Sequence, residues 1–218
     1  MEFTAYLLVA AEWIGTVAFA ISGAATAIQR KLDLFGVLLM GLLTALGGGM
    51  VRDLLVGNVP PAIFFNWPFV MAALMTSLVV FLIAYVTHHS FTSKHSPFRR
   101  IVDIADALGL GIFAVLGTQV AIQAGYENSA GLCIAMGAIT GCGGGALRDV
   151  LSREIPFVFT KQVYAVAAII GAAAYYYMMR SGIVGVNAAA TIATMLTLGI
   201  RILAMTYRWN LPKARCED

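Results

Sequence analysis

The sequence predicts an all-α integral membrane protein of seven transmembrane helices, built as two inverted three-helix repeats plus one C-terminal helix. The first observation behind this prediction is composition. Of 218 residues, 60% are hydrophobic and only 11% are charged, whereas soluble domains carry about 25% charged residues. So few charges cannot cover a water-facing surface, which excludes a soluble domain. The second observation is a self-match at a fixed offset of 96 residues.

Seven apolar runs are long enough to span a bilayer, which takes about 20 residues per helix. Turn-forming and charged residues separate them. The predicted spans are residues 5–28, 34–56, 67–87, 101–124, 130–151, 163–179 and 183–207. The chain is then one membrane domain, 1–218, with repeats at 5–90 and 101–180, a seventh helix at 183–207 and a cytoplasmic tail at 208–218.

Basic residues predict the orientation, because Lys and Arg concentrate in cytoplasmic loops. With the N-terminus outside, only Arg52 and Arg180 of the fourteen basic residues fall in outer segments, and Arg201 lies within the last span. We therefore expect a multi-pass membrane protein with its N-terminus outside and its C-terminus in the cytoplasm.

The self-match is densest in the second and fifth spans. A threonine, three glycines, an Arg-Asp pair and a later proline recur without a gap between residues 44–60 and 140–156. The same offset aligns four further pairs: Gly15 with Gly111, Ala18 with Ala114, Ser22 with Thr118, and Gly41 with Gly137. Because each repeat holds three helices, the second copy enters the membrane inverted. Such proteins place their functional site at the repeat interface near the midplane.

The two glycine triplets are the first candidate site. They are Gly47, Gly48 and Gly49 in the second span and Gly143, Gly144 and Gly145 in the fifth. Each glycine costs about 1 kcal/mol relative to alanine inside a helix. One interpretation is that both helices kink there and free backbone carbonyls that suit K⁺ or Na⁺ in a water-filled pathway. The other is that the triplets are close-packing surfaces between helices.

An Arg-Asp pair follows each triplet by about one helical turn: Arg52 and Asp53, then Arg148 and Asp149. Charges near hydrocarbon are costly and usually face a cavity or a partner. The two aspartates could attract cations at the mouths of a pathway. Alternatively, the pairs could be interfacial ion pairs that only mark helix ends.

Three further charged residues stand near the predicted helix starts. Asp103 and Asp106 open the fourth span and could add negative potential or simply face cytoplasmic water. Lys161 precedes the sixth span and could line the pathway, or snorkel as a topology lysine.

At these residues the sequence resembles the prokaryotic branch of the trimeric intracellular cation (TRIC) channel family, whose halves also carry a "glycine transporter" domain label. The most specific matches are residues 18–23 and the two Gly-Gly-Gly-x-x-Arg-Asp segments. The resemblance implies a homotrimer in the lipid of a prokaryotic plasma (inner) membrane. It also implies a K⁺- and Na⁺-permeable pore inside each subunit and kinks in the second and fifth helices.

The leading functional hypothesis is a passive channel for monovalent cations. The alternative is a secondary transporter of a small solute such as glycine, since inverted repeats with broken helices are equally typical of that class. No histidine lies inside a span and no catalytic arrangement is evident, so an enzyme is not expected. We expect no cofactor, no metal site other than a monovalent cation near the glycine triplets, and no nucleic-acid partner.

Overall fold

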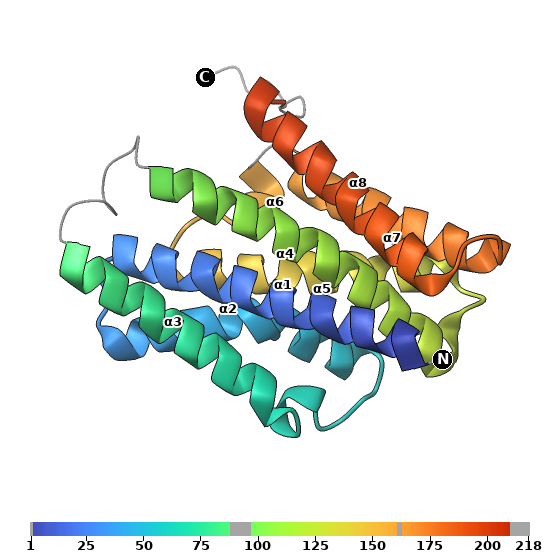
Figure 1. Cartoon of the computed structure of the whole chain (residues 1–218), viewed down its shortest axis with the longest axis horizontal. Coiled ribbons are helices and arrows are strands. Elements are labelled where there is room, and N and C mark those ends of the chain that lie inside the picture. The colour runs from blue at the N-terminus through green and yellow to red at the C-terminus, as the bar shows by residue number, and fades with distance from the viewer. Residues whose placement is uncertain (1, 88–96, 161–162, 210–218) are drawn as a thin grey trace, which may run out of the picture.

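The computed structural model describes residues 2–87, 97–160 and 163–209, and this part of the chain is almost entirely helical (Figure 1). Lys161 and the expected cytoplasmic tail from residue 210 onward lie outside the described residues. The elements are α1 (Glu2–Gln29), α2 (Leu34–Leu55), η1 (Ala62–Phe64), α3 (Trp67–Thr87), α4 (Pro97–Ala121), η2 (Ile122–Tyr126), α5 (Ala130–Leu151), α6 (Phe157–Thr160), α7 (Tyr164–Ser181) and α8 (Val186–Tyr207).

The seven long helices correspond to the seven predicted spans. Six of them are long and apolar enough to cross a membrane. The exception is α7, which has 18 residues and three consecutive tyrosines. At about 1.5 Å per residue its length is about 27 Å, close to the ~30 Å of a hydrocarbon core. Because α7 packs against α4, α5 and α8, two of its three tyrosines, Tyr175 and Tyr176, are buried.

The end of α2 and the end of α5 have the same local structure. In each, the residue after the helix donates its backbone N–H to the backbone carbonyl oxygen of the arginine in the Arg-Asp pair. The distance is 3.0 Å from Val56 to Arg52 and 2.9 Å from Ser152 to Arg148. The next residue then has a positive φ, +81° at Gly57 and +57° at Arg153. This left-handed turn reverses the chain and leads to the short helices η1 and α6, which the sequence did not predict.

The glycine triplets lie where α2 crosses α5. A Cβ on Gly48 would overlap the carbonyl oxygen of Thr140, and a Cβ on Gly144 would overlap that of Thr44. These contacts are reciprocal, as expected if a local two-fold axis relates the repeats. Only residues without a side chain allow two helix backbones to approach this closely.

This crossing corrects the expectation of freed carbonyls. Both segments are continuous α-helix through their triplets, from Leu34 to Leu55 and from Ala130 to Leu151. The backbone hydrogen bonds of the helices are therefore kept, and the glycines serve as a packing surface in this conformation. The physical reason is that contact between the two backbones compensates for the low helix propensity of glycine.

The first helix of each repeat aligns at an offset of 94 residues, and not at the expected 96. Gly15 packs against Phe113 and Gly109 packs against Phe19, which are reciprocal contacts 94 apart. The two phenylalanine rings lie 5.2 Å apart between centroids. Gly111, the expected counterpart of Gly15, instead faces α8.

The two extra residues belong to the turn between α4 and α5. This turn includes the π-helical segment η2, in which Gly125 has a φ of +91°, whereas α1 and α2 are joined by a short turn capped by Asp33. The expected matches of Ala18 with Ala114 and of Ser22 with Thr118 are therefore wrong by the same two residues.

The last helix lies outside the duplication and packs against the second repeat. Figure 1 shows α8 running along α7 and α4. It carries Arg201, whose side chain is 4% exposed and stacks over the ring of Tyr164 at 4.7 Å from its centroid. A buried arginine thus anchors α8 to the start of α7.

Candidate functional site

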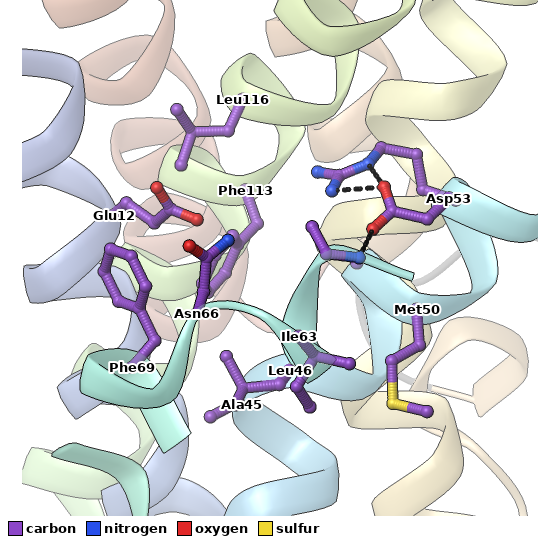
Figure 2. Close-up of a pocket in the computed structure, with 13 residues that line it drawn as sticks. Glu12, Ala45, Leu46, Met50, Asp53, Ile63, Asn66, Phe69, Phe113 and Leu116 are labelled. Carbon is purple, nitrogen blue, oxygen red and sulfur yellow. Dashed lines mark hydrogen bonds and ion pairs between the residues drawn. The ribbon is translucent and has the colours of Figure 1, made fainter. Parts of the chain in front are cut away.

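The Arg-Asp pair of the first repeat holds the chain segment that follows α2. Asp53 is 2% exposed. Its Oδ1 accepts hydrogen bonds from Nε and Nη2 of Arg52, at 3.0 and 2.7 Å, and its Oδ2 accepts from the backbone N–H of Ala62 at 2.9 Å. Figure 2 shows these contacts beside the cavity. Asp53 therefore caps the first residue of η1 as an N-cap aspartate would.

The second repeat reproduces this arrangement and adds two partners. Asp149 accepts from Arg148 Nε at 2.8 Å and from the backbone N–H of Phe157 at 2.8 Å. Nη1 of Arg148 also donates to Asp106 at 2.6 Å and to the hydroxyl of Ser22 at 2.5 Å. This buried network joins α1, α4, α5 and the start of α6.

The two arginines consequently differ in environment. The side chain of Arg52 is 13% exposed, while that of Arg148 is 2% exposed and lies 4.9 Å from the centroid of the Phe157 ring. Asp106 is 4% exposed, so it faces Arg148 and not cytoplasmic water. Among the described residues, one Arg148 nitrogen, Nη2, is buried without a hydrogen-bond partner.

Two cavities adjoin these networks, one at the end of α2 and one at the end of α5. We name the first the Arg52 cavity; it is lined by Glu12, Ala45, Leu46, Gly49, Met50, Arg52, Asp53, Ala62, Ile63, Asn66, Phe69, Phe113 and Leu116 (Figure 2). We name the second the Arg148 cavity; it has a volume of about 550 Å³ and is lined by Ser22, Thr26, Gln29, Arg30, Val102, Asp103, Asp106, Arg148, Glu154, Ile155 and Phe157.

An ion pair joins the two repeats beside the Arg148 cavity. Arg30, in the turn after α1, pairs with Glu154, in the turn after α5, and both line the cavity. Their side chains are 44% and 38% exposed. Exposed pairs contribute only about 0–1 kcal/mol, so this one can break and re-form without a large loss of stability.

Replacing Asp53 by alanine should release the segment that it caps. Without an acceptor, the N–H of Ala62 loses a charge-assisted hydrogen bond of roughly 1.5–3 kcal/mol, so its hydrogen exchange should accelerate by at least about tenfold. The measurement is hydrogen–deuterium exchange of the peptide containing Ala62 in detergent micelles.

The matched control is Asp33→Ala, which removes the exposed aspartate that caps α2 through Gly36. That variant should leave the exchange of Ala62 unchanged. Equal exchange of Ala62 in the Asp53→Ala variant and the unaltered protein would contradict the capping role.

The structure separates the predicted site residues into two groups. Gly49, Arg52 and Asp53 line the Arg52 cavity and Arg148 lines the Arg148 cavity, whereas Asp149 lies behind Arg148 as its ion-pair partner. The other glycines are packing residues at helix contacts. Between α2 and α5, Gly47 contacts Leu147, Gly48 contacts Thr140, Gly143 contacts Gly48 and Gly144 contacts Thr44; Gly145 contacts Tyr164 of α7.

Among the ionisable residues that line the Arg52 cavity, sequence reasoning missed Glu12. It has no motif around it, but it is a carboxylate inside an apolar run, and ionisable residues within a span are functional candidates by default. That signal could have found it. Asp106 was noted as a charge, but its role as the partner of Arg148 was not predicted.

Together, the fold and the two cavities define a class of protein. It is a polytopic membrane protein with inverted repeats, in which buried charges lie beside a cavity at each end of the repeat interface.

Comparison with known proteins identifies the family within this class of membrane proteins. The sequence model of the family described as Glycine transporter matches residues 9–85 and again 103–180. The UPF0126 inner membrane protein YadS of Escherichia coli K12 is 34% identical over 209 residues, which cover 94% of this chain and 95% of YadS.

Solved structures of similar proteins also match almost the whole length of this chain. A structure from work on conductance through TRIC cation channels is 38% identical, with a TM-score of 0.82 over 95% of this chain and 97% of that one. The TRIC trimeric intracellular cation channel orthologue from Rhodobacter sphaeroides is 29% identical, with a TM-score of 0.83 over 93% and 98% of the two chains. The chain belongs to the TRIC family, which carries the glycine transporter label.

Proposed function

We propose that the protein is a channel for monovalent cations, K⁺ and Na⁺, with a pathway inside each subunit. The observation that carries the proposal is the pair of acid-bearing cavities at the C-terminal ends of α2 and α5. The inverted repeat directs these ends to opposite faces of the membrane. Glu12 and Asp53 line one cavity, and Asp103, Asp106 and Glu154 line the other.

In this proposal the pathway passes the crossing of α2 and α5. It includes the glycines of both triplets and the pairs Arg52–Asp53 and Arg148–Asp149; Lys161 remains part of the same proposal. The close backbone contact between α2 and α5 at Gly48 and Gly144 would close the pathway at the crossing in this conformation. Opening requires α2 and α5 to bend at their triplets, where side chains offer no resistance to bending.

We further propose that the subunits form a homotrimer, as the words "trimeric intracellular cation channel" say of the Rhodobacter sphaeroides relative. The proposed orientation places the N-terminus outside and the C-terminus in the cytoplasm, so the Arg52 cavity opens outward and the Arg148 cavity inward. The location would be a bacterial inner membrane, as in the Escherichia coli relative.

A transporter of a small solute such as glycine is the alternative, and the arrangement of polar groups favours it less. A transporter of this plan binds its substrate near the midplane. Here the midplane crossing is filled by closely packed backbone at Gly48 and Gly144, while the charged groups lie in the two cavities on either side.

The test is recording of the purified protein in a planar bilayer under a KCl gradient. We expect unitary currents whose reversal potential lies close to the K⁺ equilibrium potential, because acids in both cavities attract cations and repel anions. Proteoliposomes should show no saturable uptake of labelled glycine. Counterflow of labelled glycine without unitary currents would replace the channel by the transporter.

A further inference from the structure

The inverted symmetry makes Glu12 the counterpart of Asp106. The two residues are 94 apart, which is the offset that the reciprocal contacts of Phe19 and Phe113 establish for α1 and α4. The two matches to the family model begin at residues 9 and 103, which are also 94 apart. Each acid therefore occupies the same place relative to the arginine of its own half.

The two acids differ in what they contact. Asp106 is buried and bound by Arg148 and Ser22. Within the described residues, by contrast, no hydrogen bond or ion pair ties the carboxylate of Glu12, and Arg52 has turned its guanidinium to Asp53. The lining of the Arg52 cavity holds two acids, Glu12 and Asp53, and one arginine, which leaves one formal negative charge in excess. Arg52 is bound to Asp53, so the carboxylate that no arginine holds in this cavity is that of Glu12.

The surroundings of Glu12 suit a cation. Its carboxylate and the side-chain amide of Asn66 point into the same cavity, beside Phe69, Phe113 and Leu116 (Figure 2). Carboxylate and amide oxygens are hard ligands of the kind that replace water around K⁺ or Na⁺. The neighbouring apolar side chains lower the local dielectric constant, which strengthens the attraction between the carboxylate and a passing cation.

We propose that Glu12 is the residue that determines cation-over-anion selectivity, acting from the Arg52 cavity with Asn66 opposite it. This inference rests on the proposed channel function. In the Arg148 cavity the equivalent acid, Asp106, is held by Arg148 and by Ser22, so its carboxylate is not free to turn toward an ion.

The experiment is bilayer recording of Glu12→Gln under a KCl gradient. The ratio of K⁺ to Cl⁻ permeability should fall by roughly fivefold to tenfold, which corresponds to losing one partly screened charge close to the ion. Unitary current should fall more in low salt than in high salt, because screening weakens the attraction that is lost. Glu12→Asp keeps the charge and should retain the selectivity.

Glu12→Cys gives a measurement on channels that are already folded and inserted. A negatively charged thiol reagent should restore the selectivity of the recorded channel, and a positively charged one should lower it further. The control is Asp33→Asn, which neutralises an exposed acid at the other end of α2 and should leave the permeability ratio unchanged.

The channel function and the role of Glu12 would be contradicted by different results. Absence of current from the unaltered protein would remove the channel function and the role of Glu12 with it. Normal current with an unchanged permeability ratio in Glu12→Gln, and after both reagents on Glu12→Cys, would overturn the role of Glu12 alone.

Discussion

Replacing Gly144 by alanine is expected to destabilise the folded protein and to reduce its current sharply. The added Cβ would overlap the carbonyl oxygen of Thr44, which belongs to a helix backbone and cannot rotate away. Relief requires α2 and α5 to move apart. Overpacking of this kind costs about 1–3 kcal/mol, which outweighs the gain of up to about 1 kcal/mol from alanine's better helix propensity.

The position within the triplet should decide the size of the effect. Gly48→Ala meets the carbonyl oxygen of Thr140 and should resemble Gly144→Ala. Gly49→Ala is the matched control, because its Cβ would lie 3.6 Å from the nearest atom, Nη2 of Arg52, an ordinary van der Waals distance. Thermal unfolding in detergent and unitary current in bilayers measure both properties. Equal losses at Gly48 and Gly49 would show that backbone contact is not what these glycines provide.

The second large effect is expected from Arg148→Leu. Removing this guanidinium leaves Asp106 without a cation and takes one of two partners from Asp149. Breaking a buried ion pair from one side costs about 3–5 kcal/mol, because a desolvated charge is left behind. The variant should therefore unfold at a markedly lower temperature than the unaltered protein.

The first repeat supplies the control for this experiment. Arg52→Leu removes the equivalent residue, but Arg52 is more exposed and, in the part of the chain that the structure describes, binds only Asp53, so the loss should be clearly smaller. A double variant, Arg148→Leu with Asp106→Leu, should recover part of the stability, since an apolar pair can replace a buried ion pair. Equal losses from Arg52→Leu and Arg148→Leu would refute the asymmetry between the two networks.

The membrane fold could be predicted because its causes are local and repetitive. Long apolar runs must become helices in a bilayer, where every backbone polar group needs a partner. The triplets and Arg-Asp pairs of residues 44–60 and 140–156 repeat without a gap, which shows a duplication. The three apolar runs in each copy make that duplication inverted. The short elements η1 and α6 escaped prediction because distant aspartates cap them.

The register of the first helices could not be predicted in the same way. Glycine and alanine are so frequent in α1 and α4 that matches such as Gly15 with Gly111 arise at a wrong offset. The true offset depends on two extra residues in the turn before α5, whose conformation is set by tertiary packing. The correspondence of Glu12 with Asp106 follows only from the corrected register.

The sequence by itself determined that this protein is a helical membrane protein with inverted repeats, and it pointed to the glycine triplets and the arginines beside them. Only the tertiary structure decided how those residues are used. Backbone contact at Gly48 and Gly144 keeps α2 and α5 helical, because close packing compensates for what glycine costs a helix. Folding also brings Arg148 to Asp106 and turns Arg52 to Asp53, away from Glu12, and these pairings decide which of the two equivalent acids is held by an arginine.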